Sequence, residues 1–354
     1  MLKLSRDTEL LLEDIERRID PEVEDKYLGE WRDFLFDRFD GDIFSPVREK
    51  KAPQTIDVPR VNINDAIDDL DLMIRLEMQE VSDLLTKGAG PLGIRANYGT
   101  GTMASIFGAE VFMMPRETNT LPTTKPLDDT DRIREIVEKG IPDIRGGLGG
   151  RMLDFGEAVK EVFTKYPKIE KYVDVFHPDT QGPLDMCEMI WGCDMFYELY
   201  DEPELVQDFL SLLTDTFIAV TDKWHGIYPI RSEMSSHWRG FFHRGAIVLR
   251  SDSAMNVSPE LYEEFSMPYD KKLLERYGGG VIHFCGRGDH YIDKLQELPQ
   301  VYGINMSQPE YNDMEKIYKN TVEKGIKILS FDGARAEQDK DRTGGFYHNL
   351  HAQH

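Results

Sequence analysis

Short apolar segments separated by helical stretches constrain the fold of this chain more than any other feature. Each segment has the length and the β-branched content of a strand, and the stretches between them carry helix-start signals such as Ser258-Pro259. Strands and helices that alternate in this way build a parallel sheet, since each helix returns the chain to the same end of the sheet. We therefore predict an α/β fold, a TIM (β/α)8 barrel. The predicted strands are 93–97, 171–177, 246–250, 281–284, 301–305 and 326–331.

The N-terminal part of the chain has a different organisation. Residues 1–40 alternate charged residues with large apolar ones, a pattern typical of one or two helices. Residues 41–62 carry three prolines and mixed charge, which favours an extended arm. We expect an N-terminal helical extension and arm over 1–62 and the barrel domain over 63–354.

Composition limits the partners and the location of the protein. The chain has 65 acidic and 42 basic residues, for a formal net charge of −23. A field of this sign repels nucleic acid and anionic membranes, so we exclude both as partners, and it disfavours a highly anionic substrate. The three cysteines do not form a disulfide framework, and the N-terminus lacks the apolar core of a signal peptide. We expect a cytoplasmic protein.

Candidate catalytic residues follow from the barrel prediction, because the active site of such a barrel lies at the carboxyl ends of its strands. Among the residues at these positions, we assign catalytic roles to Tyr98, Asp179 and Asp252. The polar side chains expected at strand ends are Asn97, Tyr98, Asp179, Asp252, His283, Cys285, Asn305 and Asp332.

A second set of residues near the strand ends is expected to bind substrate. Arg95 is the only basic residue near an early strand end, and Trp238 lies in an aromatic segment that suits the wall of a flat cofactor. Each assignment has a structural alternative, which is loop hydrogen bonding for Asp179 and Gln181 and core packing for Tyr98 and the aromatic segment. The predicted substrate-binding residues are Arg95, Asn97, Gln181, Trp238 and Asn305.

His283 and Cys285 mark the end of the predicted strand 281–284. Side chains alternate along a strand, so both residues point to the same side. An imidazole and a thiol side by side at the end of a strand make half of a zinc site. The structural alternative is a buried cysteine beside a hydrogen-bonded core histidine, and two residues alone do not decide between these interpretations.

Five segments carry a similarity to a known family. They are NYGTGTMASIFGAEVFMMP (97–115), HPDTQGPLDMCEMIWG (177–192), SDSAMNVSPELYEEFSMPY (251–269), GGGVIHFCGRGDHYIDKL (278–295) and GINMSQPE (303–310). In this order and spacing they resemble the uroporphyrinogen decarboxylase superfamily. The resemblance implies a TIM barrel and either a tetrapyrrole decarboxylase or a zinc-dependent methyltransferase that works with corrinoid-bound methyl groups.

In the methyltransferase branch, the resemblance implies Zn²⁺ held by a His-x-Cys pair and by a further cysteine after the last strand. The pair matches His283 and Cys285, whereas the further cysteine would fall near Asp332, and no cysteine follows Cys285. A carboxylate is a competent zinc ligand, so we predict a metal site of His283, Cys285 and Asp332 with an open fourth position. A carboxylate in place of a thiolate also admits other metals.

The methyltransferase branch is the closer match. The decarboxylases bind substrate carboxylates through an N-terminal arginine-bearing motif, which this chain lacks. We expect metal-dependent methyl transfer between a methyl-corrinoid, carried as co-substrate by a separate corrinoid protein, and an unidentified small-molecule acceptor. The alternatives are a decarboxylase or other lyase that acts on a porphyrin-like or smaller acid, and a non-catalytic binding barrel that retains the pocket.

Overall fold

The computed structural model of the chain describes residues 2–230, 233–237, 240–341 and 346–348. Its α-helices are α1 (Arg6–Arg18), α2 (Pro21–Leu35), α3 (Ile63–Ala66), α4 (Leu70–Lys87), α5 (Thr102–Ile106), α6 (Thr130–Lys139), α7 (Gly149–Phe163), α8 (Pro167–Tyr172), α9 (Pro183–Trp191), α10 (Met195–Asp201), α11 (Pro203–Ile227), α12 (Pro259–Phe265), α13 (Met267–Tyr277), α14 (Ile292–Leu295), α15 (Met314–Asn320) and α16 (Gly333–Gln338). Its short 3-10 helices are η1 (Arg116–Thr118), η2 (Ser253–Asn256), η3 (Pro309–Tyr311) and η4 (Val322–Lys324). Its strands are β1 (Ile43–Phe44), β2 (Gly93–Ile94), β3 (Glu110–Phe112), β4 (Thr123–Lys125), β5 (Asp174–Val175), β6 (Met234–His237), β7 (Phe241–Arg244), β8 (Ile247–Arg250), β9 (Gly280–Phe284), β10 (Val301–Met306), β11 (Lys327–Phe331) and β12 (Phe346–His348).

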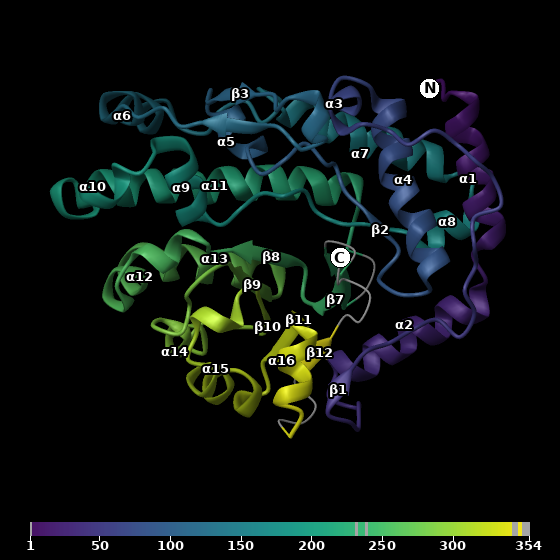
Figure 1. The fold of residues 1–354 in the computed structure, drawn as a ribbon. Helices are drawn as coiled ribbons and strands as arrows, with labels where there is room; N and C mark the ends of the chain where they lie inside the picture. Colours follow the sequence, from purple (N-terminus) through teal and green to yellow (C-terminus); the bar gives the residue numbers. More distant parts are fainter. Residues whose placement is uncertain (1, 231–232, 238–239, 342–345, 349–354) are drawn as a thin grey trace.

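A parallel sheet of order β1-β12-β11-β10-β9-β8 forms the lower half of the molecule in Figure 1. The strands β2 and β5 form a second parallel pair. The prediction of an α/β fold with parallel strands is therefore confirmed. Backbone pairing does not join the two parallel sheets into a closed ring within the described strands, so the (β/α)8 barrel stays a prediction.

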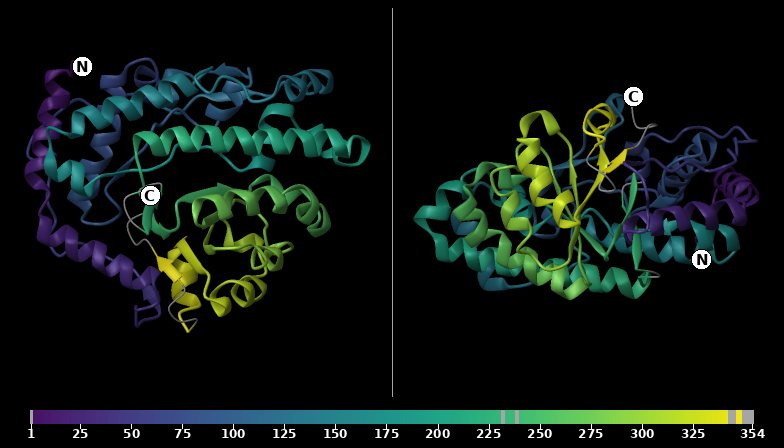
Figure 2. Two further views of the ribbon diagram at one scale, coloured as in Figure 1. Left: turned by 180° about the vertical axis from the view of Figure 1, so that it is seen from behind. Right: turned by 90° about the horizontal axis from the view of Figure 1, so that it is seen from below.

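Helices surround the sheets on several sides. Helices α12 to α16 lie around the C-terminal strands, while the helices of residues 63–227 form the upper half of the molecule (Figures 1 and 2). The main hydrophobic core extends between these halves and includes Ile247, Ile282 and Ile304 from the sheet. Within the described part of the chain, no helix combines the length and the apolar character needed to cross a membrane.

The register of β8, β9 and β10 places polar residues in one row across the sheet. Arg250 pairs with His283, and His283 pairs with Asn305. Because side chains alternate along a strand, residues two positions further on lie on the same face, beyond the strand ends. The sheet thus has two polar rows at its carboxyl edge. The first consists of Arg250, His283 and Asn305, and the second consists of the residues two positions later, beyond the ends of the three strands.

The aromatic segment that sequence analysis assigned to a cofactor wall forms the antiparallel hairpin β6–β7. Phe241 and Phe242 lie in a second hydrophobic cluster with Trp31 of α2 and with Val281 of β9. The described aromatic residues of the segment therefore pack in a core. Trp238 lies outside the described residues, so its predicted substrate contact stays a prediction.

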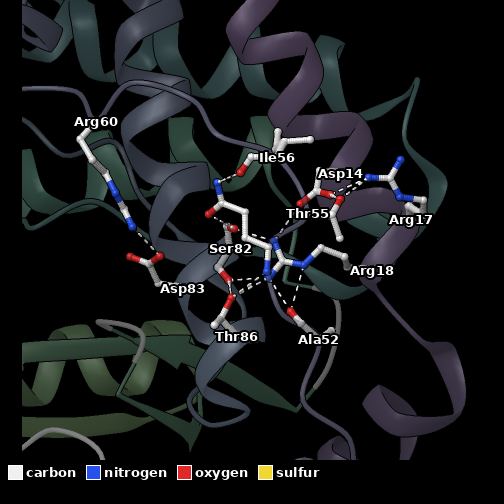
Figure 3. A network of polar contacts seen from close by, with 11 residues as sticks. Asp14, Arg17, Arg18, Ala52, Thr55, Ile56, Arg60, Ser82, Asp83 and Thr86 are labelled. Atoms are coloured by element: carbon white, nitrogen blue, oxygen red, sulfur yellow. Dashed lines mark hydrogen bonds and ion pairs between the residues drawn. The ribbon is translucent and has the colours of Figure 1, made fainter.

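The N-terminal extension is bound to the rest of the protein by Arg18 (Figure 3). Its guanidinium group donates to Asp14 of α1, to the carbonyl of Ala52 in the arm, and to Ser82 and Thr86 of α4. These bonds join three segments that are distant in the sequence. The arm also contributes β1 to the edge of the main sheet, beside β12. The proposed domain boundary at residue 62 stays a prediction.

Candidate metal centre

Three ligand atoms converge at the carboxyl edge of the main sheet, from Asp252, His283 and Cys285. His283 belongs to β9, Cys285 follows that strand directly, and Asp252 follows β8, the neighbour of β9. The Sγ atom of Cys285 lies 3.4 Å from Nε2 of His283, and Oδ1 of Asp252 lies 3.5 Å from the same nitrogen. All three ligand atoms lie within 4.8 Å of one another.

The two distances measured from His283 fit a tetrahedral zinc ion. Zinc binds sulfur at about 2.3 Å and nitrogen or oxygen at about 2.0–2.2 Å, so two ligands of one ion are separated by about 3.4–3.6 Å. The separations of 3.4 Å and 3.5 Å measured from His283 are close to that requirement. The three side chains supply three of the four ligand atoms of a tetrahedral ion. Because the side chain of Asp252 is 40% exposed, solvent or substrate has access to the fourth coordination position.

Asn305 orients His283 for such a role. The Nδ2 group of Asn305 donates to the carbonyl of Leu329 at 2.7 Å, which directs the amide oxygen toward His283. That oxygen lies 2.7 Å from Nδ1 of His283 and accepts its proton. A histidine that holds its proton on Nδ1 presents a lone pair on Nε2, the atom that faces Cys285 and Asp252. The predicted substrate-binding residue Asn305 therefore lies behind the candidate metal ligand, in a position that fixes its tautomer.

Replacing Asn305 by leucine is expected to lower zinc affinity by about 10–100-fold, since partners of metal-bound histidines have effects of this size. Leucine keeps the number and branching of the side-chain heavy atoms, but the imidazole loses the acceptor that fixes its tautomer. Titration of the metal-free protein with zinc and a competing chelator measures the change. Asn320→Leu is the matched control, because Asn320 is a buried amide whose side chain, among the described residues, donates to Lys316 O on its own helix and has no contact with the candidate metal ligands. Equal affinities in the two variants would contradict the orienting role.

The surroundings determine the protonation of the two ligands on β9. Burial lowers the pKa of His283, and the charge of Arg250 adds to this effect while Asp252 opposes it. Burial raises the pKa of the Cys285 thiol, although a contact with Ser307 at 3.4 Å acts in the opposite direction. At neutral pH the imidazole is therefore ready to bind a cation, whereas the thiol gives up its proton when a cation binds.

The structure does not bring Asp332 to this group. Its exposed side chain caps α16 by accepting the backbone N–H of Arg335 at 2.8 Å. The strand before it, β11, is separated from β9 by β10, which corresponds to about 10 Å across two strand spacings. The carboxylate that accompanies His283 and Cys285 is that of Asp252, which sequence analysis had assigned to catalysis.

We call Asp252, His283 and Cys285 together the metal group. A buried charge network lies beside it. Asp179 accepts two hydrogen bonds from Arg250, at 2.5 Å and 2.8 Å, and one from Arg95 at 3.1 Å. Gln181 also donates to Asp179, and Arg95 donates to Asn97. Burial alone would raise the pKa of Asp179, but the charges of Arg250 and Arg95 outweigh that effect and hold it below the ordinary value. Four predicted site residues thus meet in one network, in which they bind one another.

Tyr98 occupies a different environment. Its ring is 1% exposed and belongs to the main hydrophobic core. Burial raises the pKa of its hydroxyl group, and the charged residues that act on it are Arg151, Asp154 and Asp68, none of which belongs to the metal group. The structure therefore places Tyr98 in the packing position that sequence analysis gave as its alternative, and a catalytic role for it has no support in its contacts.

A cleft of about 830 Å³ opens beside the metal group. Asp252 and Gln181 belong to its wall, together with Asp185 at the start of α9. Asp185 accepts the backbone N–H groups of Asp252 and Ser253, at 3.0 Å and 2.8 Å, and so holds the loop that carries Asp252. Burial, together with the charge of Asp252, raises the pKa of Asp185 to about 6.

Three residues of the site were not predicted, although the sequence contained a signal for two of them. Arg250 and Ser307 stand two positions from Asp252 and Asn305, so the alternation that joined His283 to Cys285 also places each of them on the site's side of its strand. Asp185 carried no such signal, because its position depends on how the helix after β5 packs against the loop after β8.

Comparison with known proteins gives one informative result. No protein-family profile matches the chain, and no curated protein is similar to it in sequence. Among solved structures, a methyltransferase from Methanosarcina mazei is similar, with a TM-score of 0.54, 15% identity and coverage of 84% of this chain and 80% of that one. The chain therefore shares its fold with a methyltransferase, and its candidate metal centre lies on that fold. Membership of the uroporphyrinogen decarboxylase superfamily stays a prediction.

Proposed function

We propose that the protein is a metal-dependent methyltransferase that moves a methyl group between a methyl-corrinoid and a small-molecule acceptor. The observation that carries this proposal is the convergence of Asp252, His283 and Cys285 at the carboxyl edge of the sheet, on a fold shared with a methyltransferase. Zn²⁺ is the metal that the donor set and its spacing favour. A bound zinc ion would supply Lewis acidity, which lowers the pKa of an acceptor such as a thiol.

The residues of the chain have distinct roles in this proposal. His283 on β9 and Cys285 directly after it would hold the metal, and Asn305 keeps the His283 lone pair on Nε2. Asp252 completes the donor set and is held by Asp185 through its backbone. Asp185 lies in the cleft wall beside Asp252, and burial raises its pKa, so we assign its carboxylate to hold the proton that the acceptor releases. The acceptor then attacks the methyl carbon, and both electrons of the carbon–cobalt bond remain on cobalt.

Metal analysis and a spectroscopic assay test this function. Protein purified without chelator is expected to contain about one zinc ion per chain and to demethylate methylcobalamin when an acceptor is present, which changes the visible spectrum. Removal of the metal should stop the reaction, and added zinc should restore it. An acceptor screen of thiols, amines and tetrahydrofolate that leaves methylcobalamin intact would contradict the proposal.

The decarboxylase alternative has less support. The cleft beside the metal group is lined by carboxylates and contains no basic residue among those that the structure describes there. The arginines Arg95 and Arg250 are already bound to Asp179. An acid substrate would therefore meet repulsion without a compensating cation. Release of carbon dioxide from uroporphyrinogen would reverse this ranking, and a metal-free, inactive protein would favour a non-catalytic binding barrel.

A further inference from the structure

The cleft beside the metal group has an unusual charge. It is a cavity of about 830 Å³, and none of the described residues that line it is a lysine, an arginine or a histidine. The neutral part of its wall consists of threonine, serine, amide and methionine side chains, with Gly192, Pro126 and Cys193. The carboxylates of the wall are Asp128, Asp185, Glu188, Asp194 and Asp252.

These carboxylates are not neutralised by the protein. In the described part of the chain none of them pairs with a lysine or arginine, and only Asp252 reaches a histidine, His283, at 3.5 Å. Asp194 lies at the start of α10 without capping it through its side chain. The nearby Asp179 shows the contrast, because it is bound by two arginines. The negative charge of the cleft is therefore available to a ligand.

We propose that the cleft selects a small substrate that carries a positive charge, an organic ammonium compound, and rejects anionic substrates. The site itself is defined by the cavity and by the metal group, and the carboxylates determine the charge of what it accepts. A cleft with walls of one sign and low dielectric focuses its field and raises the local concentration of ions of opposite charge. The inference rests on the proposed function only because that function places the substrate in this cleft.

The positions of the carboxylates support this charge preference along the whole cleft. Asp128 and Asp194 are exposed at its rim, Glu188 is half-buried, and Asp185 is buried beside Asp252, which belongs to the metal group. A cation therefore meets opposite charge from the rim to Asp185, whereas at the metal group a bound zinc ion would offset the charge of Asp252. An anion meets like charge over the same distance, and no described residue of the wall offers it a charged partner.

Binding of three small thiols of similar size tests the proposal. Cysteamine carries an ammonium group, mercaptoethanol is neutral, and mercaptopropionate carries a carboxylate. Calorimetry on the full chain, with and without zinc, is expected to show cysteamine bound at least ~10-fold more tightly than mercaptopropionate, with mercaptoethanol between them. The ratio should shrink as the ionic strength rises from about 0.01 M to about 1 M, because the Debye length falls from about 30 Å to about 3 Å.

Two variants locate the effect in the cleft. Glu188→Gln combined with Asp194→Asn should reduce the ratio of cysteamine to mercaptopropionate affinity, and neither side chain has a hydrogen bond or ion pair in the described structure. Glu22→Gln, on α2 of the extension, is the control that removes one carboxylate outside the cleft, and it should leave the ratio unchanged. Equal binding of the three thiols, preference for the anion, or no binding at all would overturn the inference. Selective binding of cysteamine with methylcobalamin left intact would instead refute the proposed function and leave the charge preference standing.

Discussion

Replacing Cys285 by serine is expected to lower zinc affinity by more than ~100-fold and to abolish methyl transfer. A decrease of ~10–100-fold is typical of residues that only orient a ligand, and loss of a ligand should exceed it. Serine keeps the size of the side chain but does not ionise at neutral pH, so it offers no thiolate to the metal. The fold should persist, because Cys285 lies beyond the end of β9 and outside both hydrophobic clusters.

Competition with a chelator measures the zinc affinity of the Cys285→Ser variant, and thermal unfolding of the metal-free protein measures the stability of the fold. Cys193→Ser is the matched control, because Cys193 is an exposed free cysteine outside the metal group. It should bind zinc as the parent protein does. If Cys285 is only a packing residue, its variant will instead lose a little stability in the metal-free protein and keep its metal.

The second large effect is expected from Asp179→Asn. Asp179 is 7% exposed and accepts hydrogen bonds from Arg250, Arg95 and Gln181. The neutral amide leaves the buried guanidinium group of Arg250 and the partly buried one of Arg95 without their shared counter-charge. Removing one partner from a buried ion pair typically costs about 3–5 kcal/mol in the free energy of unfolding. Urea unfolding of both proteins at neutral pH measures this difference.

The effect should depend on pH in a defined direction. The pKa of Asp179 is depressed in the folded protein, so its contribution is complete above the unfolded pKa, about 3.9, and is lost as the pH falls through the folded value. The stability gap between the parent protein and Asp179→Asn should therefore narrow only in strong acid. Asp65→Asn, which breaks an exposed pair with Arg116, should cause no measurable change. Equal effects of the two substitutions would show that the buried network contributes little.

The metal group shows which residues of a site can be predicted from local sequence patterns and which cannot. His283 and Cys285 were predicted to share one side of a strand, and they do, because alternation along a strand needs no knowledge of the rest of the fold. The third residue could not be found in this way. The order of strands in the sheet makes β8 and β10 the neighbours of β9, so Asp252 reaches the group and Asp332 does not.

The predicted strands also show the difference between what local sequence determines and what contacts between distant segments determine. The segments 246–250, 281–284, 301–305 and 326–331 all contain strands of one parallel sheet, because their apolar and β-branched residues suit a sheet buried on both faces. In contrast, β1 was not predicted, and it lies in the segment that was expected to be an extended arm. It consists of only two residues, and its pairing with β12 depends on contacts with the far end of the chain rather than on local composition.

The pairing of β1 with β12 has a consequence for the synthesis of the protein in the cell. Ile43 leaves the ribosome long before its partner Phe346 is made, because most of the described chain lies between the two residues. The edge of the sheet therefore cannot be completed before β12 has been made, and the arm that carries β1 has no partner strand until then. Contacts between such distant segments also slow folding, because the long loop between them must close first. We expect arrest of translation before β12 to leave the sheet edge open to pairing with other chains.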